Sequence, residues 1–182
     1  MSDPVSSWFC HYSSPAGVLV LTSDGEALTG LELPLSDGGA APLPGSGWRR
    51  DESPFRQVLE QLQEYFDGER TSFDLKLRRG GTSFQRLAWD ALLTIPFGTT
   101  ISYAEQARRI GRQGAARAVG SANARNPIAI IVPCHRVIGS SGTLTGYGGG
   151  LPLKEWLLDH ESCVRDSRAR KLLGPRKLQA VS

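Results

Sequence analysis

The nine residues from Ile128 to Arg136, IAIIVPCHR, constrain the fold and chemistry of this chain more than any other stretch. Five apolar residues, typical of a buried strand, run directly into Pro133. Because proline lacks a backbone N–H and has a fixed φ, the chain must leave a sheet there. Cys134 and His135 follow side by side. The run predicts a buried strand that holds a cysteine at the floor of a pocket, where an imidazole or cation favours the nucleophilic thiolate.

Composition narrows the class of protein. The chain has 182 residues and a net charge of +3, enough for one or two compact domains and compatible with nucleic acid without establishing it. Three cysteines, no secretory leader and no run of 18 apolar residues predict a cytoplasmic protein with free cysteines and no membrane partner. Cys10 beside His11 has no partners at zinc spacing, so we expect a structural cysteine and no metal.

The expected fold class is α+β, with a small N-terminal domain over residues 1–80. That domain combines an antiparallel sheet with one helix. Turn residues, helix-capping residues and alternating apolar positions define its elements. They are strands at 18–21 and 28–33 joined by a turn at 23–25, a surface loop over 36–47, a helix capped by Ser53 with Pro54 in its first turn and ended by Gly68, and a half-buried strand through Phe73, Leu75 and Leu77.

Residues 81–161 predict a second, mostly helical domain that contains a helix-turn-helix. Helical spacing of apolar residues and the breaks at glycine and proline define the elements. They are a helix capped by Thr82 or Ser83 and broken at 96–98, a helix over 103–110, a turn at 111–114, a second helix over 115–124, and a short helix from Pro152 to Glu161.

The helix over 115–124 is nearly bare of large side chains, which lets its backbone approach another surface closely. Packing against the protein core explains this composition, and so does docking on DNA, because a helix-turn-helix places its second helix in a groove. Arg117 near the start of the helix and Arg125 at its end favour DNA.

Cys134, His135 and Glu161 form the candidate chemical site. Neighbouring side chains in an extended segment point to opposite sides, so Cys134 and His135 need a bridging water or a bent backbone to communicate. Helical spacing places Glu161 on the apolar face of its helix, and a carboxylate that points inward needs a partner such as His135. These residues therefore predict a relay that runs from the thiol through a water to the imidazole and then to the carboxylate. The alternatives are a structural cysteine and a Glu161 that caps its helix or faces water.

A glycine-rich stretch over residues 139–150 separates Cys134 from that helix. It suits either a mobile loop or a lid whose backbone N–H groups approach a ligand. Residues 162–182 are basic, which is typical of a disordered, solvated tail; additional non-specific affinity for DNA is the alternative. Cys163 near the start of this tail is expected to be incidental.

Six ordered motifs carry a resemblance to a known family: Pro133–Ile138, Gly146–Gly150, Lys154–Glu161, Ala115–Gly120, Asn126-Pro127 and Phe84-Gln85…Trp89. Together they resemble the 6-O-alkylguanine-DNA alkyltransferases, or methylated-DNA–protein-cysteine methyltransferases, of the single-module bacterial type. The resemblance is strong over about residues 82–161. Over residues 1–80 only the general layout matches, which implies a ribonuclease-H-like domain.

The resemblance implies DNA repair by direct damage reversal. Cys134 would take the alkyl group irreversibly from 6-O-methylguanine, and from 4-O-methylthymine, after the base flips out of double-stranded DNA. One molecule would act once, without a cofactor, as a monomer without an obligate protein partner. His135, through a water, would take the thiol proton, Glu161 would hold His135, and Tyr103 would donate to the ring nitrogen of the leaving base.

The remaining implied roles concern structure, DNA and the pocket. Asn126 would brace the link between the second helix and the active-site segment. Arg117 would replace the flipped base in the stack, and carbonyls at Cys134 and Val137 would accept from its exocyclic amine. The DNA contacts implied are Tyr103, Arg117, Ala118, Gly120, Ser121, Ala122 and Arg125, and the pocket residues are Val137, Tyr147, Gly148 and Gly149.

Two other functions remain open on the residues alone. A Cys-His hydrolase needs a second step in which water attacks an acyl-enzyme, and the adjacency of Cys134 and His135 argues against it. A protein that binds lesions without chemistry would not need its cysteine.

Overall fold

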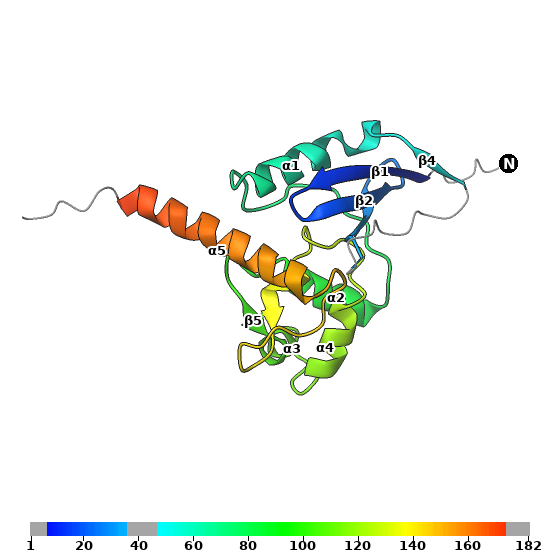
Figure 1. Cartoon of the computed structure of the whole chain (residues 1–182). Coiled ribbons are helices and arrows are strands. Elements are labelled where there is room, and N and C mark those ends of the chain that lie inside the picture. The colour runs from blue at the N-terminus through cyan, green and yellow to red at the C-terminus, as the bar shows by residue number, and fades with distance from the viewer. Residues whose placement is uncertain (1–6, 36–46, 174–182) are drawn as a thin grey trace, which may run out of the picture.

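The computed structural model describes residues 7–35 and 47–173, and its N-terminal part is a four-stranded sheet (Figure 1). The strand order is β3-β2-β1-β4. The strands are β1 (Ser7–Ser14), β2 (Gly17–Ser23), β3 (Leu28–Glu32) and β4 (Trp48–Arg50). The β2–β3 hairpin is antiparallel and confirms the predicted one. Two strands were not predicted: β1, whose polar residues hide its alternation, and β4, which has three residues and pairs parallel to β1.

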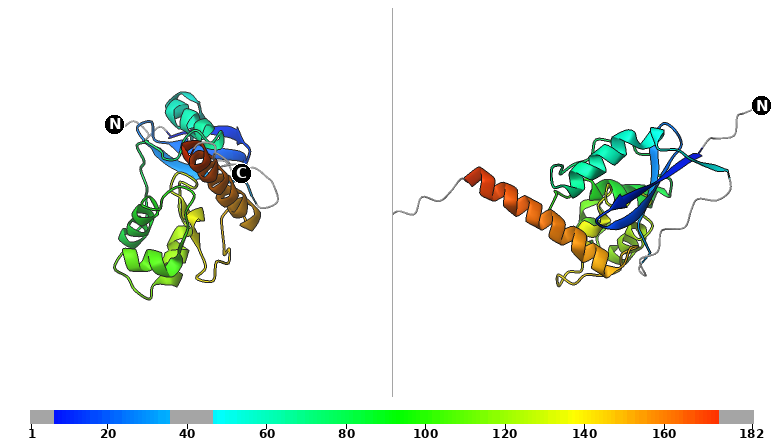
Figure 2. Two further views of the ribbon diagram at one scale, coloured as in Figure 1. Left: turned by 90° about the vertical axis from the view of Figure 1, so that its left-hand side faces the viewer. Right: turned by 45° about the horizontal axis from the view of Figure 1, so that its top comes forward.

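A single helix, α1 (Arg56–Phe66), covers this sheet (Figure 2). It follows a 3-10 turn, η1 (Ser53–Phe55), so Ser53 is not the N-cap. The backbone N–H and the hydroxyl of Ser53 both donate to Asp51 Oδ1, at 2.8 and 2.6 Å, and no side-chain hydrogen bond caps η1. Leu62 and Tyr65 are fully buried on the face of α1 that packs inward.

The strand predicted through Phe73, Leu75 and Leu77 is wrong, although the segment is extended. Only one isolated bridge, between Leu77 and Leu28, joins it to the sheet. Earlier in the segment, the side chain of Gln61 from α1 takes the place of a neighbouring strand. Its amide accepts from Asp74 N at 2.9 Å and donates to Asp74 O at 2.9 Å. A side chain satisfies those backbone groups, so no ladder forms.

The C-terminal helices confirm the predicted helix-turn-helix to within two residues. Here α3 (Tyr103–Arg109) and α4 (Ala116–Asn123) follow α2 (Ser83–Leu92) and the two-residue strand β5 (Ile101–Ser102). Of the two caps considered for α2, Thr82 is the one used, in a capping box with Gln85. The boundary between domains at residue 80 stays a prediction.

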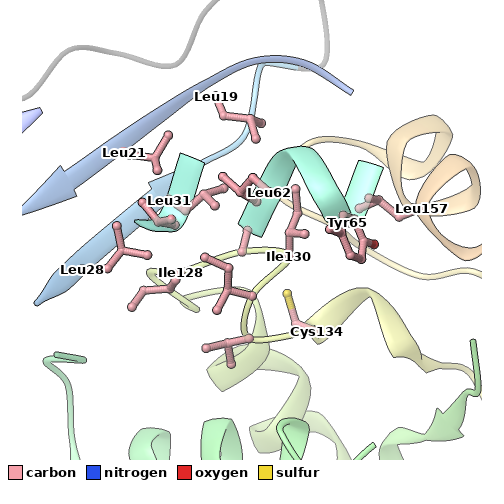
Figure 3. Packing of buried hydrophobic residues seen from close by; sticks show 14 of the residues in the cluster. Leu19, Leu21, Leu28, Leu31, Leu62, Tyr65, Ile128, Ile130, Cys134 and Leu157 are labelled. Atoms are coloured by element: carbon pink, nitrogen blue, oxygen red, sulfur yellow. The ribbon is translucent and has the colours of Figure 1, made fainter. Parts of the chain in front are cut away.

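The strand predicted for Ile128–Val132 is also wrong, because these residues form two tight buried turns instead. Ile131 N donates to Ala129 O at 2.7 Å and Val132 N to Ile128 O at 3.0 Å. Ile130 has a φ of 66°, which is strained for a β-branched residue and persists because its side chain is fully buried. Figure 3 shows Ile128 and Ile130 within the core beside Cys134. Turns, packing and one isolated bridge from Ile128 to Leu31 of β3, rather than a full strand, hold the segment before the cysteine.

Helix α5 (Leu151–Leu173) is much longer than the predicted helix that ends at Glu161. It crosses the body and then projects from it (Figures 1 and 2). A disordered tail from residue 162 is therefore wrong through residue 173, while residues 174–182 lie outside the described part. Arg168 donates to Gly68 O at 2.9 Å and Arg165 to Gly98 O, which fixes the first turns beyond Glu161.

Two other predictions concern the loop over residues 36–47 and the absence of a membrane-spanning segment. The loop expected over 36–47 lies outside the described residues except for Gly47. Within residues 7–35 and 47–173, no helix is both long and apolar enough to cross a bilayer.

Candidate active site

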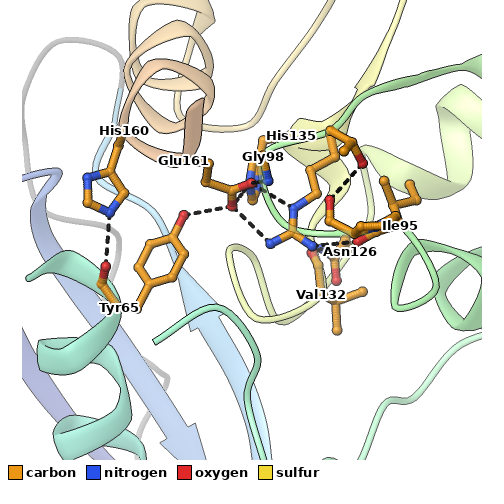
Figure 4. A network of polar contacts seen from close by, with 11 residues as sticks. Tyr65, Ile95, Gly98, Asn126, Val132, His135, His160 and Glu161 are labelled. Carbon is orange, nitrogen blue, oxygen red and sulfur yellow. Dashed lines mark hydrogen bonds and ion pairs between the residues drawn. The ribbon is translucent and has the colours of Figure 1, made fainter. Parts of the chain in front are cut away.

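The carboxylate of Glu161 is fully buried at the centre of a network that joins four parts of the chain (Figure 4). Its Oε1 accepts from His135 Nε2 at 2.8 Å, from Tyr65 OH at 2.9 Å and from Arg136 at 2.9 Å. Its Oε2 accepts from Arg136 Nε and from Gly98 N, both at 2.9 Å. Burial alone raises the pKa of Glu161, but the hydrogen bond of His135 and the hydrogen bonds and charge of Arg136 outweigh it and hold the pKa well below its usual value.

His135 is neutral and offers one free nitrogen. Its burial lowers its pKa from 6.5, more strongly than the bond to Glu161 raises it. Because an ionised carboxylate can only accept, we assign the ring proton to Nε2. The lone pair then lies on Nδ1, which is buried and has no hydrogen-bond partner among the described residues. An unprotonated nitrogen without a partner is equipped to take a proton.

Cys134 begins the 3-10 turn η2 (Cys134–Arg136) and is 8% exposed. Asn126 braces it: its Nδ2 donates to Cys134 Sγ at 3.3 Å and to Val132 O at 2.7 Å, and its Oδ1 accepts from Ile128 N at 3.1 Å. Burial raises the pKa of the Cys134 thiol, and the Asn126 bond and the charge of Lys154 only partly offset this. The resting cysteine is therefore a thiol, and its proton must leave before it can act as a nucleophile.

Cys134 lies in a pocket with a volume of about 170 Å³. The helix-turn-helix, the glycine-rich loop and the end of β3 all contribute to its wall. A larger hollow of about 350 Å³ on the Arg136 side does not include the cysteine. Predicted site residues in the smaller pocket are Tyr103, Gly120, Asn126, Cys134, Tyr147 and Gly148, and residues from the N-terminal part are Leu31, Glu32, Leu33 and Leu35.

Two predicted pocket residues lie elsewhere. Val137 is fully buried in β6 (Val137–Ile138), which pairs with β5, and its side chain does not line the pocket. Gly149 is buried behind the pocket wall, where a Cβ would lie 2.4 Å from Leu153 Cδ2 and 3.2 Å from Leu33 Cδ1. Gly149 therefore permits the loop to pack closely, whereas a Cβ at Gly148 would meet nothing within 4 Å.

The residues predicted to contact DNA divide into two groups. Arg117, Ala118 and Ser121 are exposed on α4, and Arg125 is exposed and donates to Ser121 O at 2.9 Å. Ala122 does not share this face. It is 3% exposed, and its carbonyl accepts from Trp89 Nε1 at 2.9 Å, because this side of α4 packs on α2.

Sequence reasoning missed three residues that the structure places around the site. Arg136 pairs with Glu161 through two hydrogen bonds, and Tyr65 reaches the same carboxylate from α1. Lys154 is fully buried and donates to Val137 O at 2.7 Å. One signal was available: residues 154, 157 and 161 follow helical spacing, so Lys154 shares the buried face of α5 with Glu161.

Replacing Glu161 by glutamine tests the network, because it keeps the shape and leaves the buried Arg136 without a counter-charge. Breaking a buried pair costs about 3–5 kcal/mol, so we expect Glu161→Gln to lower the free energy of unfolding by about that amount, measured by urea denaturation at pH 7. The exposed Glu155→Gln on the same helix is the control and should change it by under about 0.5 kcal/mol.

The pH dependence of that difference follows from the pKa of Glu161. Because folding lowers this pKa, the stabilisation is complete above its usual value of 4.5 and is lost as the pH falls below it. The gap between wild type and Glu161→Gln should therefore narrow on acidification. A gap that stays constant from neutral to acidic pH would contradict the buried ion pair.

Comparison with known proteins agrees with this geometry. Residues 83–163 match the family model described as 6-O-methylguanine DNA methyltransferase, DNA binding domain, and residues 10–78 match that of its ribonuclease-like domain. A methylated-DNA–protein-cysteine methyltransferase of Mycobacterium leprae is 53% identical over 81% of this chain and 88% of its own length. One of Methanosarcina acetivorans is 48% identical over 86% and 99%.

Solved structures give the same result. A crystal structure of Mycobacterium tuberculosis OGT in complex with DNA has a TM-score of 0.80 and 49% identity, and the match covers 86% of this chain and 94% of that one. Another, of Mycobacterium tuberculosis O6-methylguanine methyltransferase, has a TM-score of 0.80, with 46% identity over 94% and 97% of the two chains. The chain belongs to the 6-O-methylguanine DNA methyltransferase family.

Proposed function

We propose that this protein repairs DNA by transferring the alkyl group of 6-O-methylguanine, and of 4-O-methylthymine, irreversibly to its own Cys134. One observation carries the proposal: a thiol in a pocket precedes a neutral histidine whose free Nδ1 is buried without a partner. The relatives' shared activity, methylated-DNA–protein-cysteine methyltransferase, is this reaction. It is a single-turnover transfer that needs no cofactor.

The proton of Cys134 leaves first. A water between Sγ and His135 Nδ1 passes the thiol proton to the imidazole, and the buried carboxylate of Glu161 stabilises the imidazolium that forms. This relay suits the chain because Sγ and Nδ1 have no hydrogen bond to each other. Asn126 holds Sγ from the other side and thereby keeps its direction of attack fixed.

Alkyl transfer follows as an in-line displacement at the methyl carbon. The Cys134 thiolate forms the S–C bond, the C–O bond breaks, and its electron pair passes to the guanine. Tyr103, which lines the pocket, donates its proton to the ring nitrogen so that the base leaves as a neutral species, and the proton held by His135 then passes through water to restore the Tyr103 phenol. The thioether that remains is stable, so each molecule acts once.

The substrate base must enter the pocket from a duplex, where its alkyl group is out of reach. Helix α4 lies in the minor groove, with Ala118, Gly120 and Ser121 against the backbone and Arg125 beside them. Arg117 enters the stack in place of the flipped base and offsets part of the unstacking cost, which is a few kcal/mol. Because the minor groove carries a degenerate code, sequence preference is weak, as a search for rare lesions requires.

The pocket recognises the flipped base through backbone groups and Tyr147. The carbonyls of Cys134 and Val137 accept from its exocyclic amine, and the Gly148 N–H donates to an acceptor atom of the base. We further propose that the protein works in the cytoplasm as a monomer, without a protein partner. Its three cysteines are free, as a reducing compartment requires.

Mass spectrometry of the protein mixed with a duplex that carries one 6-O-methylguanine tests the reaction. We expect the peptide that contains Cys134 to gain one CH2, stopping at one per molecule, because the thioether is not turned over. Cys134→Ser is the control and should bind the duplex without gaining mass. A wild-type protein that binds the duplex unmodified would be a lesion-binding protein, and repeated turnover of an ester would indicate a hydrolase.

Replacing Arg117 by alanine separates base flipping from chemistry. We expect methyl transfer from duplex DNA to slow by at least about tenfold, because Arg117 no longer offsets its part of the few kcal/mol that unstacking costs. Transfer from the free nucleoside 6-O-methyldeoxyguanosine should be unchanged, since no base is flipped. The exposed Arg112→Ala, in the turn between α3 and α4, is the matched control. Equal slowing with both substrates would contradict the role of Arg117.

A further inference from the structure

The pocket of Cys134 contains one acidic side chain that the reaction described above does not use. Of the described residues that line this pocket, Glu32 alone is acidic or basic, and its neighbours in the chain, Leu31 and Leu33, are apolar. Glu32 is the last residue of β3, and its side chain is exposed. The N-terminal part of the protein thus brings a carboxylate to the wall of the pocket that holds the nucleophile.

Backbone hydrogen bonds fix this end of β3 against the segment that leads to the cysteine. Leu31 N donates to Pro127 O at 2.8 Å, and Ala129 N donates to Leu31 O at 3.2 Å. Within the sheet, Glu32 pairs with Val20, which is fully buried. Ala129 lines the same pocket. Glu32 therefore has a defined place on the pocket wall, on a strand that is held from both sides.

The carboxylate of Glu32 has no counter-charge among residues 7–35 and 47–173. Burial raises its pKa, and neither a hydrogen bond nor a nearby charge of those residues opposes the rise. Phosphate groups repel a carboxylate, so Glu32 does not contribute to affinity for the DNA backbone. The pKa of the Cys134 thiol responds to Asn126 and Lys154 but not to Glu32. The charge of Glu32 is therefore left to act on the group that enters the pocket.

The part of the substrate that can reach this charge is the outer end of the alkyl group. Displacement takes place at the carbon bonded to the 6-oxygen, so that carbon must lie against Cys134 Sγ. A methyl group ends there, whereas a longer group continues along the pocket wall, on which Glu32 is the charged side chain. A flipped base that fills the pocket displaces its water, and charges interact more strongly where water is excluded.

We propose that Glu32 is a specificity-determining residue that excludes alkyl groups with a negative charge and favours those that end in a hydrogen-bond donor. An ionised carboxylate only accepts hydrogen bonds, so it binds a hydroxyl or an amide N–H of the alkyl group and repels a second carboxylate. The preferred substrates beyond 6-O-methylguanine are thus neutral hydroxyalkyl and amidoalkyl adducts. The inference rests on the proposed function and names the alkyl groups that the same pocket accepts.

Two adducts of nearly equal size separate charge from shape. One is 6-O-carboxymethylguanine, an anion, and the other is its neutral amide, 6-O-carbamoylmethylguanine, each placed in the same duplex. The rate of transfer to the Cys134 peptide is followed by mass spectrometry and divided by the rate for 6-O-methylguanine in the same protein, so a general change in activity cancels. The intrinsic reactivities of the two adducts are the same for every protein and cancel when proteins are compared.

The ratio of the amide rate to the acid rate should depend on residue 32. A like charge within about 4–6 Å changes an equilibrium by about tenfold or more, so Glu32→Gln should lower this ratio about tenfold, and Glu32→Lys should lower it further. Glu26→Gln, at a side chain that is 68% exposed and outside the pocket, is the control and should keep the wild-type ratio. Equal ratios in wild type, Glu32→Gln and Glu32→Lys would overturn the proposal.

A binding measurement separates this inference from the proposed function, because it needs no chemistry. Equilibrium binding of the same two duplexes to Cys134→Ser, with and without Glu32→Gln, should show the same change in ratio. Methyl transfer with ratios that do not depend on residue 32 would keep the transferase and reject the role of Glu32. Binding ratios that change with residue 32, in a protein that gains no methyl group from 6-O-methylguanine, would keep Glu32 and reject the transferase.

Discussion

The buried carboxylate of Glu161 is the interaction on which the rest of the structure depends. Five hydrogen bonds converge on it, from Tyr65 of the N-terminal part, Gly98 of the loop before β5, and the two residues after the cysteine. Gly98 has a φ of 68°, and a Cβ there would lie 3.0 Å from the Glu161 carbonyl, so the close approach requires glycine. The same contacts that join α1 to α5 also orient the reactive segment.

The chemistry follows from how this network distributes charge. Arg136 shares the negative charge of Glu161, so the carboxylate leaves the imidazole neutral at rest but still stabilises the imidazolium once the thiol proton arrives. It still accepts from His135 Nε2 and thereby selects the tautomer with a basic Nδ1. Near this network, the buried Lys154 donates to Val137 O and thereby holds the strand that follows the cysteine turn. The reactive cysteine is thus held as a thiol at rest, with the acceptor for its proton already in place.

Much of the site could be predicted, because several of its residues lie within short sequence patterns. Helical spacing placed Glu161 inward, and small residues with a glycine turn predicted the helix-turn-helix. The turns over Ile128–Val132 could not be predicted, because an apolar run has the same composition in a buried strand and in a buried turn. The positive φ of Ile130 has no sequence signature either. Arg136 and Tyr65 were missed because their contacts with Glu161 are tertiary. Helix α5 passed its expected end because no glycine or proline follows Glu161 before residue 174.

The central claim, that His135 is a neutral base with its proton on Nε2, is tested most directly by 15N NMR of the ring nitrogens. The chain has only three histidines, so His135 can be assigned by comparison with His135→Gln. Since burial lowers its pKa from 6.5, the account predicts an unprotonated Nδ1 and a protonated Nε2 from pH 8 down to at least pH 6.5. An imidazolium at pH 7, or a proton on Nδ1 instead of Nε2, would contradict it.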